Sequence, residues 1–250
     1  SLFSQKIPGK MYVARPSFAL YESHCKYYGI PYEPWELDKD LQYVPDQLDN
    51  MPKGSVVIFA SPNNPVGNSL SKSDFQSLLE RHPNSLFLAD EAYYEFAEEP
   101  YTDLLKRHSN LILIRTFFKS LGCAGVRIGY LMGATRYLEQ IRKLRLPYLL
   151  NHFSLAAGET ILTDPQIKRT LLANVEQTKK DRDHVAAELE RIGAKHFTVI
   201  PSQANFLLLR CHDESFKTKL QNDLVSHGIL IRDVSKGPGL AGCLRLTIGN

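Results

Sequence analysis

The sequence is poor in the residues that build disulfide frameworks and metal sites. It has four cysteines among 250 residues, and no two of them form a C-x-x-C pair: Cys25, Cys123, Cys211 and Cys243. Its eight histidines show none of the short spacings that are typical of zinc ligands. We therefore interpret the cysteines as free thiols in a reducing compartment and expect no metal site.

Long apolar runs and a strong excess of one charge are missing as well. No apolar stretch approaches the roughly 20 residues that a membrane-spanning helix needs, and no signal-peptide pattern opens the chain. The 30 basic and 27 acidic residues leave a net charge of +3, which is too small to indicate nucleic-acid binding. With 43% hydrophobic residues, the composition favours a globular, cytoplasmic protein that buries a core.

The first two thirds of the sequence alternate apolar strands with amphipathic helices. Residues 71–82 carry apolar side chains at helical spacing, with Ser71 or Ser73 as a candidate N-cap. Short apolar runs predict strands at residues 11–15, 55–60, 85–90, 110–116 and 126–133. Some of these runs are continuous, as is typical of strands that are buried on both faces of a sheet. This order predicts βα units and a mostly parallel sheet flanked by helices.

The last third has a different pattern. A long amphipathic helix is predicted from about Asp164, with Pro165 in its first turn, to Arg191, and Gly193 ends it. Further elements are predicted as a strand region at 197–210, a helix at 213–228 and strands at 229–235 and 243–249. These elements indicate a smaller α+β domain.

Together the two parts predict an α/β protein with two domains. We expect a large domain over residues 1–158 and a small C-terminal α+β domain over residues 159–250. A strand-like MYVAR follows after only ten residues, and the chain stops in or just past the strand-like LRLTIGN. We therefore expect the large domain to be incomplete at its N-terminus.

Three of the predicted strands lead directly into a polar residue. Asn64 follows the first within SPNNPVG, Asp90 closes the second, and Lys119 follows the third. Because parallel strands place their carboxyl ends at one edge, where ligands bind, these side chains are predicted to converge. With Arg127 nearby, the set suits pyridoxal 5′-phosphate (PLP), which needs a lysine for covalent attachment, a carboxylate at its pyridinium nitrogen and a cation for its phosphate.

Four motifs carry a resemblance to a known family: SPNNPVG, DEAYYEF, the Lys119–Arg127 pair and CLRLTIG. From about Pro8 to Gly249 the sequence resembles class I/II aminotransferases of PLP fold type I, and most of all the histidinol-phosphate aminotransferases. The resemblance implies the fold-type-I large domain, PLP as cofactor and a homodimer. It also implies amino transfer from a donor such as histidinol phosphate to a 2-oxo acid such as 2-oxoglutarate, as in histidine biosynthesis.

The resemblance further implies roles for individual residues. Lys119 matches the lysine that binds the cofactor and moves the substrate proton. The other implied cofactor contacts are Asp90 at the pyridinium nitrogen, Tyr93 and Asn64 at O3′, Phe18 on the ring, and Arg127 with Thr116 at the phosphate. The implied substrate contacts are Arg245 and Arg232 at anionic groups, supported by Asn205. Strand alternation independently predicts that Arg245 projects from the face opposite Leu244 and Leu246.

The sequence departs from the family pattern in three places, and these keep alternatives open. Phe118 stands where the family has a phosphate-binding serine, Val66 replaces a threonine, and the family's N-terminal segment has no counterpart here. A catalytically silent domain with a structural or dimer-forming role is one alternative. A threonine-phosphate-type decarboxylase or an aromatic aminotransferase of the same fold is another. Tyr94 is a rival to Tyr93, and Lys236 to Lys119.

Overall fold

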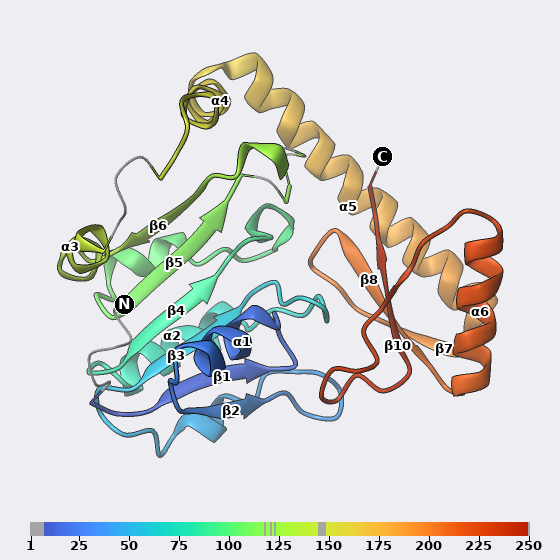
Figure 1. The fold of residues 1–250 in the computed structure, drawn as a ribbon, viewed down its shortest axis with the longest axis horizontal. Coiled ribbons are helices and arrows are strands. Elements are labelled where there is room, and N and C mark those ends of the chain that lie inside the picture. Colours follow the sequence, from blue (N-terminus) through green and yellow to red (C-terminus); the bar gives the residue numbers. More distant parts are fainter. Residues whose placement is uncertain (1–7, 118, 121, 123, 145–148, 250) are drawn as a thin grey trace.

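The computed structural model describes residues 8–117, 119, 120, 122, 124–144 and 149–249. Within these residues the strands form two sheets (Figure 1). The larger sheet, here the large sheet, has the order β2-β1-β3-β4-β5-β6. Its strands are β1 (Met11–Arg15), β2 (Tyr32–Glu36), β3 (Val56–Ala60), β4 (Leu86–Asp90), β5 (Leu111–Thr116) and β6 (Gly129–Gly133).

The large sheet is parallel from β2 through β5, which confirms the predicted mostly parallel sheet. β6 pairs antiparallel with β5 and begins at Gly129, so the strand predicted from residue 126 starts three residues too early. Arg127 adopts a φ of 54°, which turns the backbone before β6 can begin. Gly129 allows close pairing, because a Cβ there would lie 2.9 Å from the carbonyl oxygen of Arg115.

Helices connect and flank these strands. They are α1 (Leu20–Tyr27), α2 (Lys72–Arg81), α3 (Thr135–Lys143) and α4 (His152–Thr163). Ser71 is the N-cap of α2, since its side chain accepts a hydrogen bond from the backbone N–H of Asp74. The main core contains the buried aromatic rings of Trp35, Phe59, Phe75 and Phe87, which meet at steep angles.

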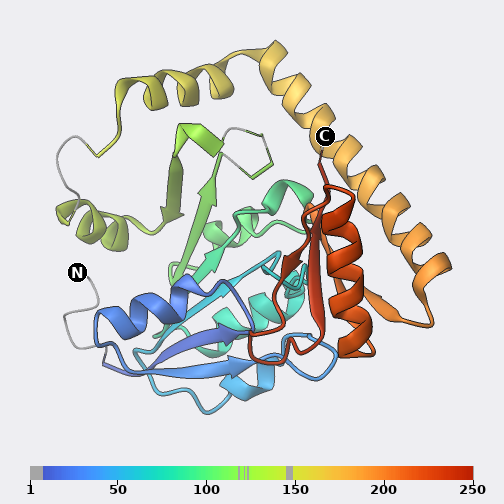
Figure 2. The same ribbon diagram turned by 45° about the vertical axis from the view of Figure 1, so that its right-hand side comes forward.

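A second sheet, the small sheet, has the order β7-β8-β10-β9 and is antiparallel in each pairing. Its elements are α5 (Pro165–Gly193), β7 (Phe197–Ile200), β8 (Phe206–Cys211), α6 (Glu214–Ser226), β9 (Arg232–Asp233) and β10 (Cys243–Thr247). Asp164 caps α5 by accepting from the N–H groups of Gln166 and Ile167. The helix runs from α4 across to the small sheet (Figure 2). The predicted domain boundary at residues 158 and 159 falls within α4 and stays a prediction.

Three strand predictions in this part were too long, and the strand predicted at 243–249 ends at Thr247. The region 197–210 is two strands, and the break begins at Pro201, which has no N–H to donate to a neighbouring strand. The region 229–235 contains only the two-residue β9, since its pairing with β10 covers Arg232 and Asp233 alone. The composition of residues 229–235 is typical of a strand, but it does not show over which residues the neighbouring strand pairs with them.

The turn at Gly67 joins the large sheet to the loop between β7 and β8. The N–H of Gln203 donates to the carbonyl of Gly67 at 2.7 Å. Gly67 has a φ of 93°, and a Cβ there would lie 2.3 Å from the hydroxyl oxygen of Ser202. Only a residue without a side chain permits this approach.

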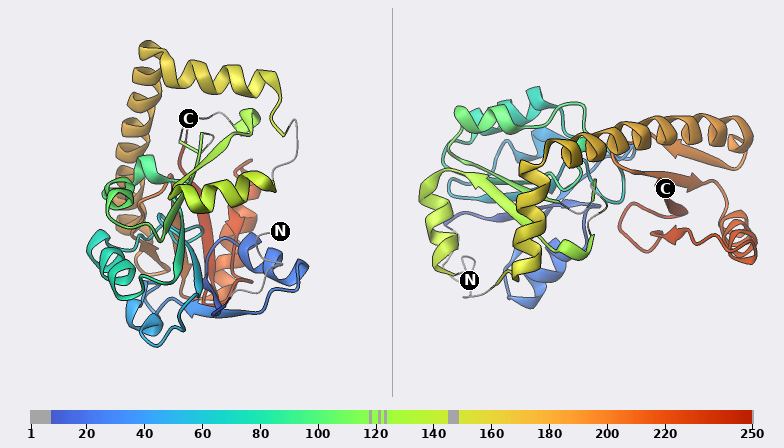
Figure 3. Two further views of the ribbon diagram at one scale, coloured as in Figure 1. Left: turned by 90° about the vertical axis from the view of Figure 1, so that its left-hand side faces the viewer. Right: turned by 90° about the horizontal axis from the view of Figure 1, so that it is seen from above.

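The cysteines and the helices can be compared with the expectations from composition. Cys25, Cys211 and Cys243 are buried free thiols. α4 extends away from the large sheet (Figure 3), and Phe153 on it is strongly exposed. Among the described helices, none combines the length and apolar character needed to cross a membrane.

Candidate cofactor and substrate site

The carboxyl ends of β3, β4 and β5 meet at one edge of the large sheet, as the sequence predicted. A cavity of about 460 Å³ lies there, here called the sheet-edge cavity. It is lined by all of the residues predicted to contact the cofactor: Phe18, Asn64, Asp90, Tyr93, Thr116, Lys119 and Arg127. The fold therefore brings together residues that are up to 109 positions apart in sequence, from 18 to 127.

Asp90 is the buried acid of this cavity. Its Oδ1 accepts a hydrogen bond from the N–H of Ala92 at 2.9 Å, and its Oδ2 accepts one from the hydroxyl of Tyr21 at 2.5 Å. Burial raises the pKa of the Asp90 carboxyl, while these two hydrogen bonds and the charge of Lys119 act in the opposite direction. A carboxylate held at two oxygens in this way is fixed in orientation.

Tyr21 is a site residue that the sequence reasoning missed. It lies on α1 and lines the sheet-edge cavity. The rings of Phe18 and Tyr21 meet edge to face, with centroids 5.6 Å apart. The i, i+3 spacing of two aromatic residues in SFALY was the signal that could have indicated a shared face. Phe18 itself is 39% exposed, so it is not a core residue, and its ring is available to a ligand.

The structure distinguishes between the two neighbouring tyrosines. Tyr93 lines the sheet-edge cavity, and the amine of Lys119 lies 5.4 Å from the centroid of its ring. Tyr94 instead packs under the guanidinium of Arg115, whose Cζ is 3.7 Å from the ring centroid. Tyr93 is therefore the tyrosine placed to contact a ligand in the cavity.

The remaining predicted contacts lie at the end of β5 and beyond it. Thr116 is buried, and its hydroxyl donates to the carbonyl oxygen of Ile128 at 3.1 Å. Arg127 is exposed at the turn before β6. Phe118, the residue that differs from the family's serine, lies outside the described residues. The cation predicted for a phosphate is thus at the cavity, and the effect of Phe118 stays open.

Lys119 lies among charges that disfavour its protonated form. Desolvation lowers the pKa of its amine, and the positive charges of Arg245, Arg127 and Arg232 lower it further. The carboxylate of Asp90 raises the same pKa. The net effect is a lowered pKa, so a larger fraction of Lys119 is neutral and nucleophilic at a given pH.

Replacing Arg245 with glutamine is expected to raise the pKa of Lys119, because the substitution removes one of the cations that lower it. The pH midpoint for the reaction of Lys119 with an aldehyde then moves to higher pH. The measurement is the rate of labelling by pyridoxal and borohydride across pH, followed on the Lys119 peptide by mass spectrometry. Arg191→Gln, at an exposed ion pair on α5, is the control. An unchanged midpoint in Arg245→Gln contradicts the prediction.

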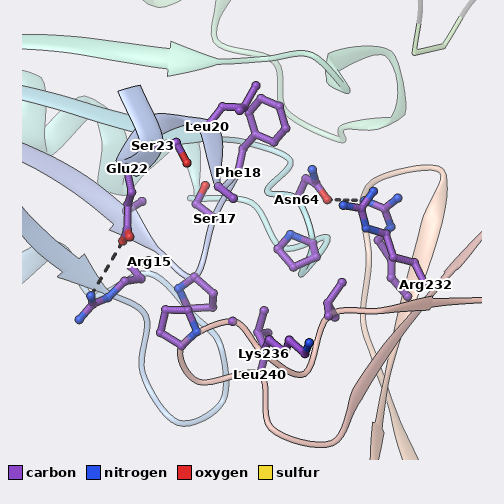
Figure 4. A pocket seen from close by; sticks show the side chains of 18 of the residues that line it. Arg15, Ser17, Phe18, Leu20, Glu22, Ser23, Asn64, Arg232, Lys236 and Leu240 are labelled. Carbon is purple, nitrogen blue, oxygen red and sulfur yellow. Dashed lines mark hydrogen bonds and ion pairs between the residues drawn. The ribbon is translucent and has the colours of Figure 1, made fainter. Parts of the chain in front are cut away.

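A second cavity of about 780 Å³, the arginine cavity, adjoins the first and shares Phe18, Asn64 and Lys119 with it. The small sheet contributes Arg232 and Arg245 to its lining. Figure 4 shows Phe18 and Lys236 at opposite sides of the cavity, and the dashed line at Asn64 marks its hydrogen bond with Arg245.

Arg232 and Arg245 are paired neighbours on β9 and β10. The pKa of Arg245 is lowered, first by desolvation and then by the like charge of Arg232. Two guanidinium groups side by side, one of them partly desolvated, form a site for a carboxylate or a phosphate. Lys236, the rival lysine, lines the arginine cavity but not the sheet-edge cavity. Lys119 lines both cavities, and of these two lysines it is the one at the sheet edge.

Asn64 and Asn205 make contacts that the sequence did not predict. The Oδ1 of Asn64 accepts a hydrogen bond from Nη1 of Arg245 at 2.5 Å, which links the large sheet to the small one. The backbone carbonyl of Asn205 accepts from the N–H of Ile248. Within the part of the chain that the structure describes, no hydrogen bond joins the Asn205 side chain to Arg245, and its supporting role stays a prediction.

The fold and this site define an aminotransferase-like α/β protein, and the sequence comparisons identify the family. Residues 3–250 match the family of aminotransferases class I and II, and the chain belongs to that family.

Individual relatives have more specific names than the family as a whole. The histidinol-phosphate aminotransferase of Thermoanaerobacter pseudethanolicus is 32% identical over 241 residues, which are 94% of this chain and 65% of the relative. This chain thus spans about 65% of the length of that curated relative.

Solved structures agree on the fold. The histidinol-phosphate aminotransferase of Clostridium acetobutylicum has a TM-score of 0.86 and 27% identity, over 96% of this chain and 73% of that one. The L-threonine-O-3-phosphate decarboxylase of Porphyromonas gingivalis has a TM-score of 0.82 and 26% identity, over 97% of this chain and 72% of that one. Both the predicted activity and its decarboxylase alternative therefore occur on this fold.

Proposed function

We propose that this protein is a PLP-dependent aminotransferase. It would transfer an amino group from a donor such as histidinol phosphate to a 2-oxo acid such as 2-oxoglutarate. The observation that carries the proposal is the placement of Lys119 and Asp90 in one cavity that adjoins a second cavity with Arg232 and Arg245. The relatives named histidinol-phosphate aminotransferase support the choice of donor. A role in histidine biosynthesis, a homodimer and a cytoplasmic location belong to the same proposal.

The residues at the sheet edge fit PLP. Asp90 offers a buried, oriented carboxylate for a pyridinium nitrogen, and Phe18 offers an exposed ring for stacking. Arg127 supplies a cation for the phosphate, and Tyr93 a hydroxyl at the cavity wall. When bound, the cofactor supplies an electron sink for the negative charge that develops at the substrate Cα.

The chain's own residues then have separate tasks. Arg232 and Arg245 bind the anionic group of the donor and so orient its Cα–H. The lowered pKa of Lys119 increases the fraction of Nζ that is neutral, the form in which it can take up the Cα proton and return it. Asn64 holds Arg245 by accepting the hydrogen bond from its Nη1.

Covalent attachment of PLP at Lys119 is the expected result of the first test. The 250-residue chain is incubated with PLP, reduced with borohydride and digested, and the modified peptide is identified by mass spectrometry. Amino transfer is then followed as glutamate formed from 2-oxoglutarate with histidinol phosphate, or with an aromatic amino acid as a rival donor. A chain that shows neither attachment nor a visible absorption band with PLP is the silent domain of the alternative interpretation.

A decarboxylase is the second candidate, and the Porphyromonas gingivalis structure supports it. The two reactions use similar binding groups, because a phosphorylated amino acid also needs cations such as Arg232 and Arg245. They differ in product. Release of CO₂ from O-phospho-L-threonine without glutamate formation favours decarboxylation, whereas formation of glutamate from 2-oxoglutarate with histidinol phosphate as amino donor favours amino transfer.

A further inference from the structure

Phe206 connects the two cavities without lining either of them. It lies at the start of β8 and is 1% exposed. The Cζ atom of Arg245 lies 5.0 Å from the centroid of its ring. The ring of Tyr93 meets it edge to face, with centroids 5.3 Å apart and an interplanar angle of 85°. One buried ring therefore contacts both the arginine of one cavity and the tyrosine of the other.

The strand register explains how Arg245 reaches this ring. Arg245 stands directly opposite Leu208, and Phe206 is paired with Thr247, two residues further along β10. Phe206 is thus the diagonal neighbour of Arg245 on the same face, within the reach of a long side chain. The ring itself is held in place by Tyr93 and by the cluster that includes Phe96 and Val175.

The contacts of Arg245 leave one edge of its guanidinium for a ligand. Nη1 donates to Asn64, and the ring of Phe206 supports the group. Nε has no hydrogen-bond partner among the described residues, but it is closed off from solvent, so it is not the atom that a ligand reaches. Arg245 lines the arginine cavity, and the part of its guanidinium that faces this cavity can receive an oxyanion.

We propose that Phe206 is a positioning residue that fixes the guanidinium of Arg245, so that the part facing the arginine cavity receives a carboxylate or phosphate oxygen of the substrate. Phe206 acts through Arg245 and does not touch the substrate. The attraction between a cation and the face of a ring favours this placement, and the edge-on contact with Tyr93 keeps the ring from turning. The inference rests on the proposed function for the identity of the anion.

Phe206→Leu tests the inference, because leucine keeps apolar bulk and removes the ring face. Isothermal titration of the cofactor-free 250-residue chain with 2-oxoglutarate measures anion affinity without any turnover. We expect about 5- to 30-fold weaker binding, the range of a partly to fully desolvated cation–π contact. Where activity is present, the KM for 2-oxoglutarate rises by a similar factor and kcat changes little.

The control is Phe197→Leu, the same substitution at another buried ring of the small sheet that does not contact Arg245. It is expected to leave the affinity unchanged. A second comparison uses Arg245→Gln, in which adding Phe206→Leu should cause no further loss, because the ring acts only through the arginine.

Phe206→Met, which fills the space with a flexible apolar chain, is titrated as well in case leucine impairs folding. Unchanged affinity in the folded Phe206 variants overturns the inference. So does an equal loss in Phe197→Leu, or a loss that persists in the Arg245→Gln background. Failure of PLP to attach at Lys119 would instead count against the proposed function, and it leaves these titrations readable.

Discussion

Replacing Lys119 with alanine is expected to abolish covalent attachment of PLP and to lower the rate of amino transfer by at least about 10²- to 10⁴-fold, the usual contribution of a positioned acid–base group. The reason is that Lys119 is the lysine at the carboxyl edge of the parallel strands, in the same cavity as Asp90. Borohydride reduction with peptide mass spectrometry reads the attachment, and glutamate formation reads the rate.

Lys236→Ala is the matched control for this experiment. Lys236 is the rival lysine, and it lines the arginine cavity but not the sheet-edge cavity. We expect this variant to retain PLP attachment at Lys119. Reductive attachment that survives in Lys119→Ala and disappears in Lys236→Ala would show that the wrong lysine has been assigned.

Replacing Glu91 with alanine is expected to destabilise the fold by about 3–5 kcal/mol, the usual cost of removing one partner from a buried ion pair. The side chains of Glu91 and Arg115 are 1% and 7% exposed, and Nη2 of Arg115 lies 2.7 Å from Oε2 of Glu91. Oε1 of Glu91 also accepts from the N–H of Tyr101. The substitution leaves the guanidinium buried without its counter-charge, and the free energy of unfolding in urea measures the loss.

A less buried ion pair on the same sheet provides the comparison. Arg15 and Glu36 pair at the ends of β1 and β2, where their side chains are 31% and 42% exposed. Glu36→Ala is therefore expected to cost less than about 1 kcal/mol. Adding Arg115→Met to Glu91→Ala should recover part of the stability, because it removes the unpaired charge. Equal losses in Glu91→Ala and Glu36→Ala would contradict the assigned importance of burial.

The prediction of the sheet edge from sequence succeeded for a specific reason. β3, β4 and β5 are short apolar runs whose ends coincide with turn-forming or polar residues, so their bounds were predicted to within one residue. Parallel pairing then requires that Asn64, Asp90 and Lys119 meet. Local sequence and one rule of topology were enough for this part of the site.

The parts that sequence did not reveal depend on contacts through space. Tyr21 reaches Asp90 from α1, which is 69 residues away in sequence, and no local pattern specifies that contact. Phe206 has the composition of an ordinary core residue, and only the register of β8 against β10 brings its ring to Arg245. β6 pairs antiparallel with β5 after a connection in which Arg127 has a φ of 54°, and hydrophobicity alone does not indicate this direction.

The turn at Gly67 has a consequence for how an anion is held. Arg245 belongs to the small sheet and its partner Asn64 to the large one, so the space between the two sheets sets the width of the arginine cavity. The close approach of Gly67 to Ser202 is one of the contacts that set this space, and an added side chain there would push the two sheets apart. A glycine outside both cavities therefore helps to set the size of the ligand that can bind.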